Sequence, residues 1–137
     1  MTQQQTADAL AAVLLAHRDQ LIEMLVDQAP AAGSGYAEAP PEQLRPRMSM
    51  VLDACIASIA QAQPGILISF MEMTAERRLR EGYTIDSLIT LALITEGALT
   101  DTAEMAFEDA PEQRAEAQAQ IRTLIAAAEQ ALGSMAG

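Results

Sequence analysis

The sequence predicts an all-α protein, on three features of its composition and pattern. Alanine, leucine, glutamate, glutamine and arginine dominate the chain, and all of them favour helices. Valine, a strand former, occurs only at Val13, Val26 and Val51, and no segment shows a convincing strand-like alternation. Apolar residues instead recur at three- and four-residue spacing. A length of 137 residues fits one domain, 1–137, with a hydrophobic core.

The first helix is expected from about Thr6 to Gln28, where apolar residues follow one another at helical spacing. One of its stripes contains Leu10, Leu14, His17, Leu21 and either Met24 or Leu25. A flexible loop of about residues 29–41 follows, because this region alone is rich in glycine, proline and serine. Tyr36, in the middle of that loop, either packs into the core or stays exposed.

The second helix is expected to start within residues 42–47 and to end near Gln61. Proline is tolerated only in a first turn, so Pro46 indicates either a separate short turn before the helix or a distorted start. The third helix is expected to open at Pro64, a favourable first position, and to end near Glu81.

The fourth helix, about 85–108, is expected to be the buried centre of a five-helix bundle. Gly82 suits the left-handed position that closes the preceding helix, and Thr84 is a good N-cap. From Leu88 to Ile94 only Thr90 interrupts the apolar side chains. A helix that is apolar on all sides has to be buried on all sides.

The fifth helix is expected from Pro111 to Gly133, with alanine at many positions. Gly97, in the middle of the fourth helix, costs roughly 1 kcal/mol relative to alanine. Its presence there indicates the close approach of another element, most simply a neighbouring helix.

The charge is strongly negative. The formal net charge is −11, and all eight basic residues are arginines. Such a field repels phosphate groups, so we expect no nucleic-acid partner and no docking on anionic membranes. The segment from Glu96 to Glu116 carries seven carboxylates against Arg114 alone. This segment is either a solvated corner between helices or a docking patch for a basic partner.

Cys55 is the only cysteine, so no internal disulfide forms, as is usual in a reducing cytosol. The first residues lack the basic start and apolar run of a signal peptide. No apolar segment approaches the roughly 18 residues of a membrane span. We therefore expect a soluble, cytoplasmic protein, and the sequence suggests no role for Cys55.

His17 is the lone histidine and lies on the apolar stripe of the first helix. One histidine could bind a haem iron axially, but a histidine in such a position is more often a neutral core residue bonded to a carbonyl or carboxylate. With one histidine and one cysteine, no His/Cys metal cluster is expected. We expect no cofactor.

Arg77, Arg78 and Arg80 place three of the eight arginines within four residues. Glu76 and Arg80 are four residues apart, as are Arg77 and Glu81, so each pair can form an ion pair on the helix surface. The structural interpretation of the cluster is therefore a solvated helix end with salt bridges. The functional alternative is a docking site for an acidic surface or a small anion.

Glu96 shares a face of the apolar fourth helix and is therefore expected to be partly buried. A buried carboxylate needs a partner to stay charged, and we expect Arg78, across the Gly82 corner, to supply it. The alternative is a ligand-facing group. The eight methionines are either adaptable core residues or the lining of a small apolar cavity.

The stretch AERRLREGYTIDSLITLALITEGAL resembles the N-terminal domain of the RsbR/RsbRD family, the RsbT co-antagonists of bacterial stressosomes. The resemblance lies in Arg78 four residues before Gly82, in the aromatic Tyr83 after it, and in the leucine-rich helix that begins near Leu88. Two further segments resemble the first and second helices of the family, LLAHRDQLIEML and LRPRMSMVLDACIASI.

The resemblance implies a globin-like helical sensory domain that binds no haem and pairs into homodimers. In the family this domain precedes a STAS output domain, whereas this chain ends at Gly137, so the resemblance implies a free-standing sensor or adaptor. It carries over no catalytic residue.

Three functions compete. The first is a non-enzymatic regulatory or sensory module in bacterial stress or environmental signalling, which acts through protein–protein contacts with a regulatory partner and as a homodimer. The second is a carrier of small apolar molecules, with a pocket lined by methionines and His17. The third, an enzyme, is the least favoured, because no phosphate loop, catalytic triad or metal motif occurs.

Overall fold

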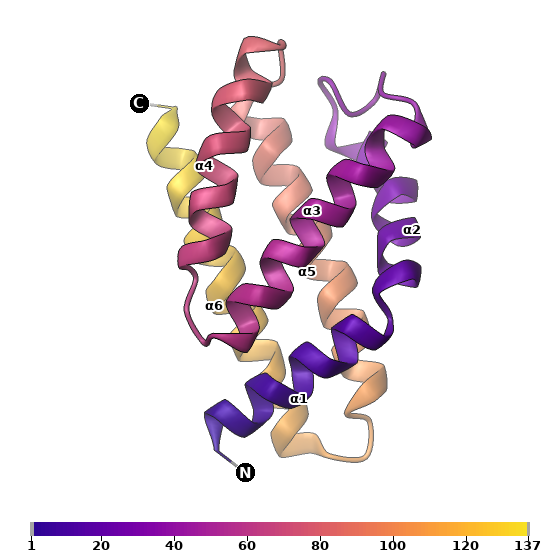
Figure 1. The fold of residues 1–137 in the computed structure, drawn as a ribbon, viewed down its shortest axis with the longest axis vertical. Coiled ribbons are helices and arrows are strands. Elements are labelled where there is room, and N and C mark those ends of the chain that lie inside the picture. The colour runs from indigo at the N-terminus through magenta and orange to yellow at the C-terminus, as the bar shows by residue number, and fades with distance from the viewer. Residues whose placement is uncertain (1, 137) are drawn as a thin grey trace.

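The computed structural model describes residues 2–136 and is all-α, without a strand in that range. Six α-helices and one short 3₁₀ helix follow one another along the chain (Figure 1). They are α1 (Gln3–Ala16), α2 (Arg18–Gln28), η1 (Ala29–Ala32), α3 (Pro41–Ala60), α4 (Gly65–Arg80), α5 (Ile85–Ala106) and α6 (Pro111–Met135). The all-α prediction is confirmed, but the number of helices is six and not five.

The additional helix arises because the chain breaks at His17. This residue ends α1 and begins α2, with φ −104° and ψ 16°, and its backbone N–H still bonds to carbonyls of α1. The break lets α1 cross one end of the molecule while α2 runs along α3 (Figure 1). Neither glycine nor proline occurs at the break, and the apolar pattern of the sequence continues through it. The sequence therefore predicts one helix where the structure has two.

The helices pack around one hydrophobic cluster to which every element contributes. Figure 1 shows α3 and α4 in front, α5 and α6 behind them, and α1 across the lower end. Helix α5 contacts α1, α2, η1, α4 and α6, as expected of the central helix. The prediction that it is buried on all sides is wrong, because Leu93 is 43% exposed and Gly97 also lies at the surface.

The corner before α5 forms as predicted. Gly82 has φ +95°, and the N–H of Tyr83 bonds to the carbonyl of Arg78, which closes α4. Thr84 caps α5 by accepting a hydrogen bond of 3.0 Å from the N–H of Ser87. This closed corner fixes the position of Tyr83 between α4 and α5.

The proposed loop contains η1 and a series of turns, and Tyr36 within it is buried. Helix α3 begins directly after it, at Pro41, and continues through Pro46. Neither alternative for Pro46 is therefore right: the proline lies inside one continuous helix. Since proline has no N–H, the carbonyl four residues earlier, on Glu42, lacks its helical partner.

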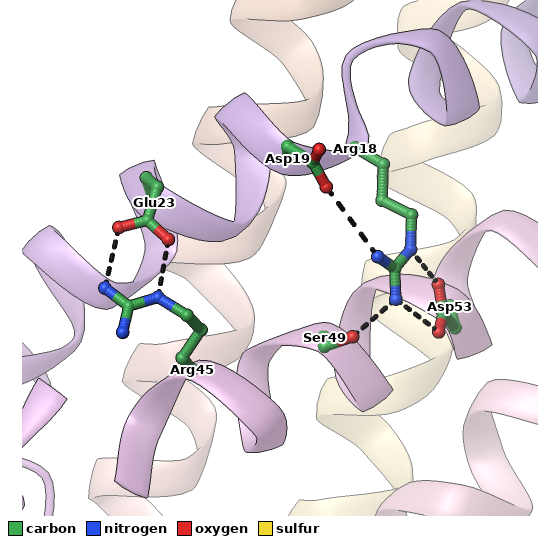
Figure 2. A network of polar contacts seen from close by, with 6 residues as sticks. All are labelled: Arg18, Asp19, Glu23, Arg45, Ser49 and Asp53. Carbon is green, nitrogen blue, oxygen red and sulfur yellow. Dashed lines mark hydrogen bonds and ion pairs between the residues drawn. The ribbon is translucent and has the colours of Figure 1, made fainter. Parts of the chain in front are cut away.

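Two arginine–carboxylate pairs connect α2 to α3 (Figure 2). Arg45 donates two hydrogen bonds to Glu23, at 2.7 and 2.9 Å. Arg18 donates two to Asp53, at 2.8 and 2.9 Å, and a third to Ser49. These contacts use one face of α3, so the face toward α4 stays free for the site described below.

The Arg18–Asp53 pair predicts a pH-dependent contribution to stability. The hydrogen bond from Arg18 has the largest effect and lowers the pKa of Asp53. Burial acts in the opposite direction, and the positive charge of Arg18 lowers the pKa further. The pair therefore contributes fully to stability above the pKa that Asp53 has in the unfolded chain. This contribution is lost as the pH falls through the lower pKa that Asp53 has in the folded protein. Asp53→Asn should lower the free energy of unfolding by about 0.5 kcal/mol at pH 7, because the pair is largely solvated.

Urea unfolding of both proteins at pH 7 and at about pH 2.5 measures this difference, which should shrink to near zero in acid. Asp27→Asn, at an exposed position of α2 that takes part in neither pair, is the control and should not lower stability. An equal loss for Asp53→Asn at both pH values would contradict the assignment.

Candidate functional site

Two tyrosines and two arginines gather where the turns after η1 meet α3 and the end of α4. The rings of Tyr36 and Tyr83 meet edge to face, with centroids 4.9 Å apart and planes at 89°. Nη1 of Arg47 donates a hydrogen bond of 2.7 Å to the hydroxyl of Tyr83. The guanidinium carbon of Arg78 lies 5.9 Å from the centroid of the Tyr83 ring.

Gly35 makes this arrangement possible. Its φ is +86°, and a Cβ at this position would lie 2.5 Å from three atoms of the Tyr83 ring. The backbone of the loop therefore approaches the ring more closely than any residue with a side chain allows. The absence of a side chain on Gly35 therefore allows the Tyr83 ring to pack against Tyr36.

The Tyr36 hydroxyl stays protonated at any physiological pH. Burial, together with the neighbouring Tyr83, raises the pKa of Tyr36 to about 12, although the charges of Arg78 and Arg47 act in the opposite direction. Tyr36 therefore offers a neutral hydroxyl, a hydrogen-bond donor, at the edge of the cluster.

Beside this cluster, α3 and α4 enclose a cavity of about 110 Å³, which we call the arginine–methionine groove. Its lining combines apolar side chains with three arginines: Tyr36, Arg47, Met48, Met50, Val51, Phe70, Met73, Thr74, Arg77, Arg78 and Leu91. Met50 is 56% exposed and Met73 is 60% exposed. Large apolar side chains thus stand in solvent directly beside positive charges.

The groove has positive charge that the chain does not neutralise. Arg78 is buried and pairs with Glu81 at 3.0 Å. Arg47 contacts only a neutral phenol, and Arg77 is exposed without an ion pair among residues 2–136. In a chain of net charge −11, this is an unusual local excess of cations.

The structure separates the three clustered arginines of α4. Arg78 points into the tyrosine cluster, Arg77 lines the groove, and Arg80 is exposed and lines no part of it. The expected i,i+4 ion pairs do not form in the described part of the chain. The ion pair at this helix end instead joins Arg78 to Glu81. The sequence therefore predicted the cluster but missed Arg47, Tyr36 and Met50 as its neighbours.

Glu96 is half-buried, as predicted. The prediction that Arg78 is its partner is wrong. The carboxylate faces Arg122 of α6, which lies 2.7 Å from Oε2 and donates a hydrogen bond of 2.9 Å to Oε1. Arg122 also contacts Glu129. Only the Oε1 contact has hydrogen-bond geometry, so Oε2 is held by charge alone. Arg78 cannot serve Glu96, since it belongs to the tyrosine cluster.

His17 is half-buried at the junction of α1 and α2, and its Nδ1 donates to the carbonyl of Val13 at 2.9 Å. A carbonyl-bonded histidine was one of the two interpretations of its sequence position. The ring does not line the groove, so the expected pocket of methionines with His17 does not form there. The histidine instead supports the break between the two helices.

Cys55 lies in the core, and burial raises the pKa of its thiol to about 12. The neutral thiol is a poor nucleophile, so Cys55 acts as a small apolar core residue. Residues 2–136 contain no group of three or more histidine, cysteine, aspartate or glutamate side chains arranged to hold a metal ion. In the same range, no helix is both long and apolar enough for a membrane span.

A second cleft, of about 320 Å³, lies between the start of α1, the turn after α3, and α6. Its lining consists mainly of amides and small side chains, and its one carboxylate, Glu116, accepts a hydrogen bond from Gln120. The cleft therefore offers a ligand one carboxylate without an ion pair in the described range and few large apolar side chains. The groove combines arginines with large exposed apolar side chains, and we take it as the candidate functional site.

Comparison of the chain with protein-family models, with curated proteins and with solved structures gave no match.

Two glycines of one loop provide a test of the tyrosine cluster. Gly33→Ala and Gly35→Ala both force a side chain into a left-handed backbone, at a cost of about 1–3 kcal/mol each. Only the new Cβ at position 35 also meets the Tyr83 ring, whereas position 33 is open. Thermal unfolding should therefore show Gly35→Ala to be the less stable variant, by roughly 1–3 kcal/mol more.

Near-ultraviolet circular dichroism of the same two variants gives a second measurement, because it reports the packing of tyrosine rings. Gly35→Ala should lose the tyrosine signal that Gly33→Ala keeps. Equal stability and equal spectra for the two variants would contradict the contact between Gly35 and Tyr83.

Proposed function

We propose that this chain is a non-enzymatic regulatory or sensory module that acts through protein–protein contacts. The observation that carries the proposal is the arginine–methionine groove, where exposed Met50 and Met73 adjoin uncompensated arginines. Exposed methionines are common on protein-binding surfaces, because their flexible side chains adapt to a partner. Arginine is likewise enriched at such interfaces.

The size of the groove supports a protein partner over a small apolar ligand. Ligand pockets usually enclose about 300–1,000 Å³, whereas the groove encloses about 110 Å³. The small void that Met71 lines with Cys55 and Leu91 inside the core has about 10 Å³, which is at the lower limit for one water molecule. The cleft of about 320 Å³ between α1 and α6 reaches the size of a ligand pocket, but amides and small side chains make up most of its lining. We therefore keep the carrier as the second candidate.

The chemistry of the two most reactive side chains also supports a role without catalysis. Cys55 is a buried neutral thiol, and the Nδ1 of His17 is engaged by a backbone carbonyl. The carbonyl orients the His17 ring, but no hydrogen bond within residues 2–136 joins His17 or Cys55 to a second side chain that would act as nucleophile or base.

The proposal includes what the resemblance to the RsbR/RsbRD N-terminal domain implies: a globin-like helix arrangement, a role in bacterial stress or environmental signalling, and homodimers. The six-helix architecture and the aromatic Tyr83 after the Gly82 corner are compatible with it. Self-association is further supported by Met50 and Met73, two exposed large apolar side chains that line the same groove.

An affinity capture tests this function. The tagged chain and its Met50→Gln/Met73→Gln variant are incubated with extract of the source organism, and captured proteins are quantified by mass spectrometry. We expect a stoichiometric partner on the unmodified chain and roughly tenfold less on the variant, since both apolar contacts are lost. Leu15→Gln, an equally exposed position on α1, is the control and should keep the partner.

Native mass spectrometry of the isolated protein separates the two candidate functions. A bound small molecule, together with no captured partner, would favour the carrier and overturn the regulatory proposal.

A further inference from the structure

We propose that the arginine–methionine groove binds the acidic corner between α5 and α6 of a second copy of this chain, with Met105 as the inserted side chain. This inference rests on the proposed function, because it specifies which surfaces associate in the expected homodimer. It joins the two charged segments that the sequence analysis singled out, the arginines of α4 and the carboxylates after Glu96.

The acidic corner combines one exposed apolar side chain with several carboxylates. Met105, at the end of α5, is 62% exposed, the highest value among the large hydrophobic residues. Asp101, one helical turn before it, and Glu108, three residues after it, are exposed as well. We define the acidic corner by these residues and their exposed neighbours, which are Asp101, Glu104, Met105, Glu108, Asp109 and Glu112.

The corner has negative charge that the chain leaves free. None of these carboxylates belongs to an ion pair within residues 2–136. Arg114, the only basic residue of the segment, donates instead to the backbone carbonyl of Glu108. The corner therefore has the opposite charge to the groove, where Arg77 is unpaired and Arg47 contacts only a phenol.

The groove also offers space for an inserted side chain. Its cavity of about 110 Å³ exceeds the roughly 10–15 Å³ that one water molecule needs, and it is smaller than the roughly 300 Å³ of a small-molecule pocket. Met50, Met73 and Phe70 provide the apolar walls, and arginines stand at the rim, where the carboxylates beside Met105 would lie. One anchor in a pocket with a charged rim is a common arrangement at protein interfaces.

The two surfaces lie too far apart to meet within one chain. Helix α5 begins at the Gly82 corner, near the groove, and ends at the acidic corner (Figure 1). Leu91, the residue of α5 that lines the groove, lies 14 positions before Met105, which is roughly 21 Å along the helix. Contact therefore requires two copies, either antiparallel around a two-fold axis or head to tail.

One inserted side chain and a few solvated charge pairs give a weak association. A stable interface buries about 800 Å² on each partner, and exposed ion pairs contribute little and are screened by salt. Each copy also has a net charge of −11, and the resulting repulsion between copies is strongest at low ionic strength. Association is therefore best measured at about 0.1 M salt, where the Debye length is about 10 Å, and it should weaken as more salt screens the contact pairs.

Charge reversal on each surface tests the assignment. Sedimentation velocity over a range of protein concentrations at about 0.1 M salt gives the dissociation constant for self-association. Arg77→Glu, in the groove, and Asp101→Arg/Glu108→Arg, in the corner, should each raise this constant by about tenfold or more, since like charges then face each other. An equimolar mixture of the two variants should associate again, because each reversed surface meets its complement.

Three controls make the result specific, and circular dichroism verifies the fold of every variant. Arg77→Lys keeps the charge and should keep the association. Asp27→Arg reverses a charge on α2, outside both surfaces, and should leave the constant unchanged. Leu93→Gln alters the exposed face of α5, the competing apolar surface, and should also have no effect.

Several outcomes would overturn the inference. A chain that stays monomeric at about 0.1 M salt, or a dimer that only Leu93→Gln dissociates, excludes the pairing of groove and corner. Failure of the mixed variants to associate does the same. The proposed regulatory function is judged separately, by the captured partner, because a heterologous partner can occupy the groove of a monomer.

Discussion

The packing of the Tyr83 ring is the contact on which the rest of the site depends. Its edge-to-face partner Tyr36 comes from the turns after η1, Arg47 from α3 and Arg78 from α4, while the Gly82 corner fixes its backbone. Three segments, the turns after η1, helix α3 and the end of α4 with its Gly82 corner, thus meet at one side chain. The groove lies against this cluster, so its walls keep their spacing only while the ring stays in place.

Local signals in the sequence were sufficient for most helices. Glycine at position 82, threonine at position 84 and the run of apolar residues after it predicted the corner and the start of α5, because capping is decided by neighbouring residues. The break at His17 had no such signal. The apolar stripe continues on both sides, and the change of direction depends on contacts with α3 that are remote in sequence.

The site was predictable only in part, for the same reason. The arginines of α4 were visible as a cluster, but a one-dimensional pattern could not show that Arg78 turns inward while Arg77 stays in solvent. Nor could it select Arg122 as the partner of Glu96, 26 residues away on α6, over the nearer Arg78. Which charges pair is decided by helix packing, and the spacing of residues along the chain contains little of that information.

The separation of charge along α5 has a consequence for kinetics. A molecule with free cations at one end and free carboxylates at the other has a large permanent dipole moment. Two such molecules experience a mutual torque before they touch, so collisions with productive orientation become more frequent than chance. The diffusional encounter of copies, as well as the lifetime of the complex, should then respond to ionic strength.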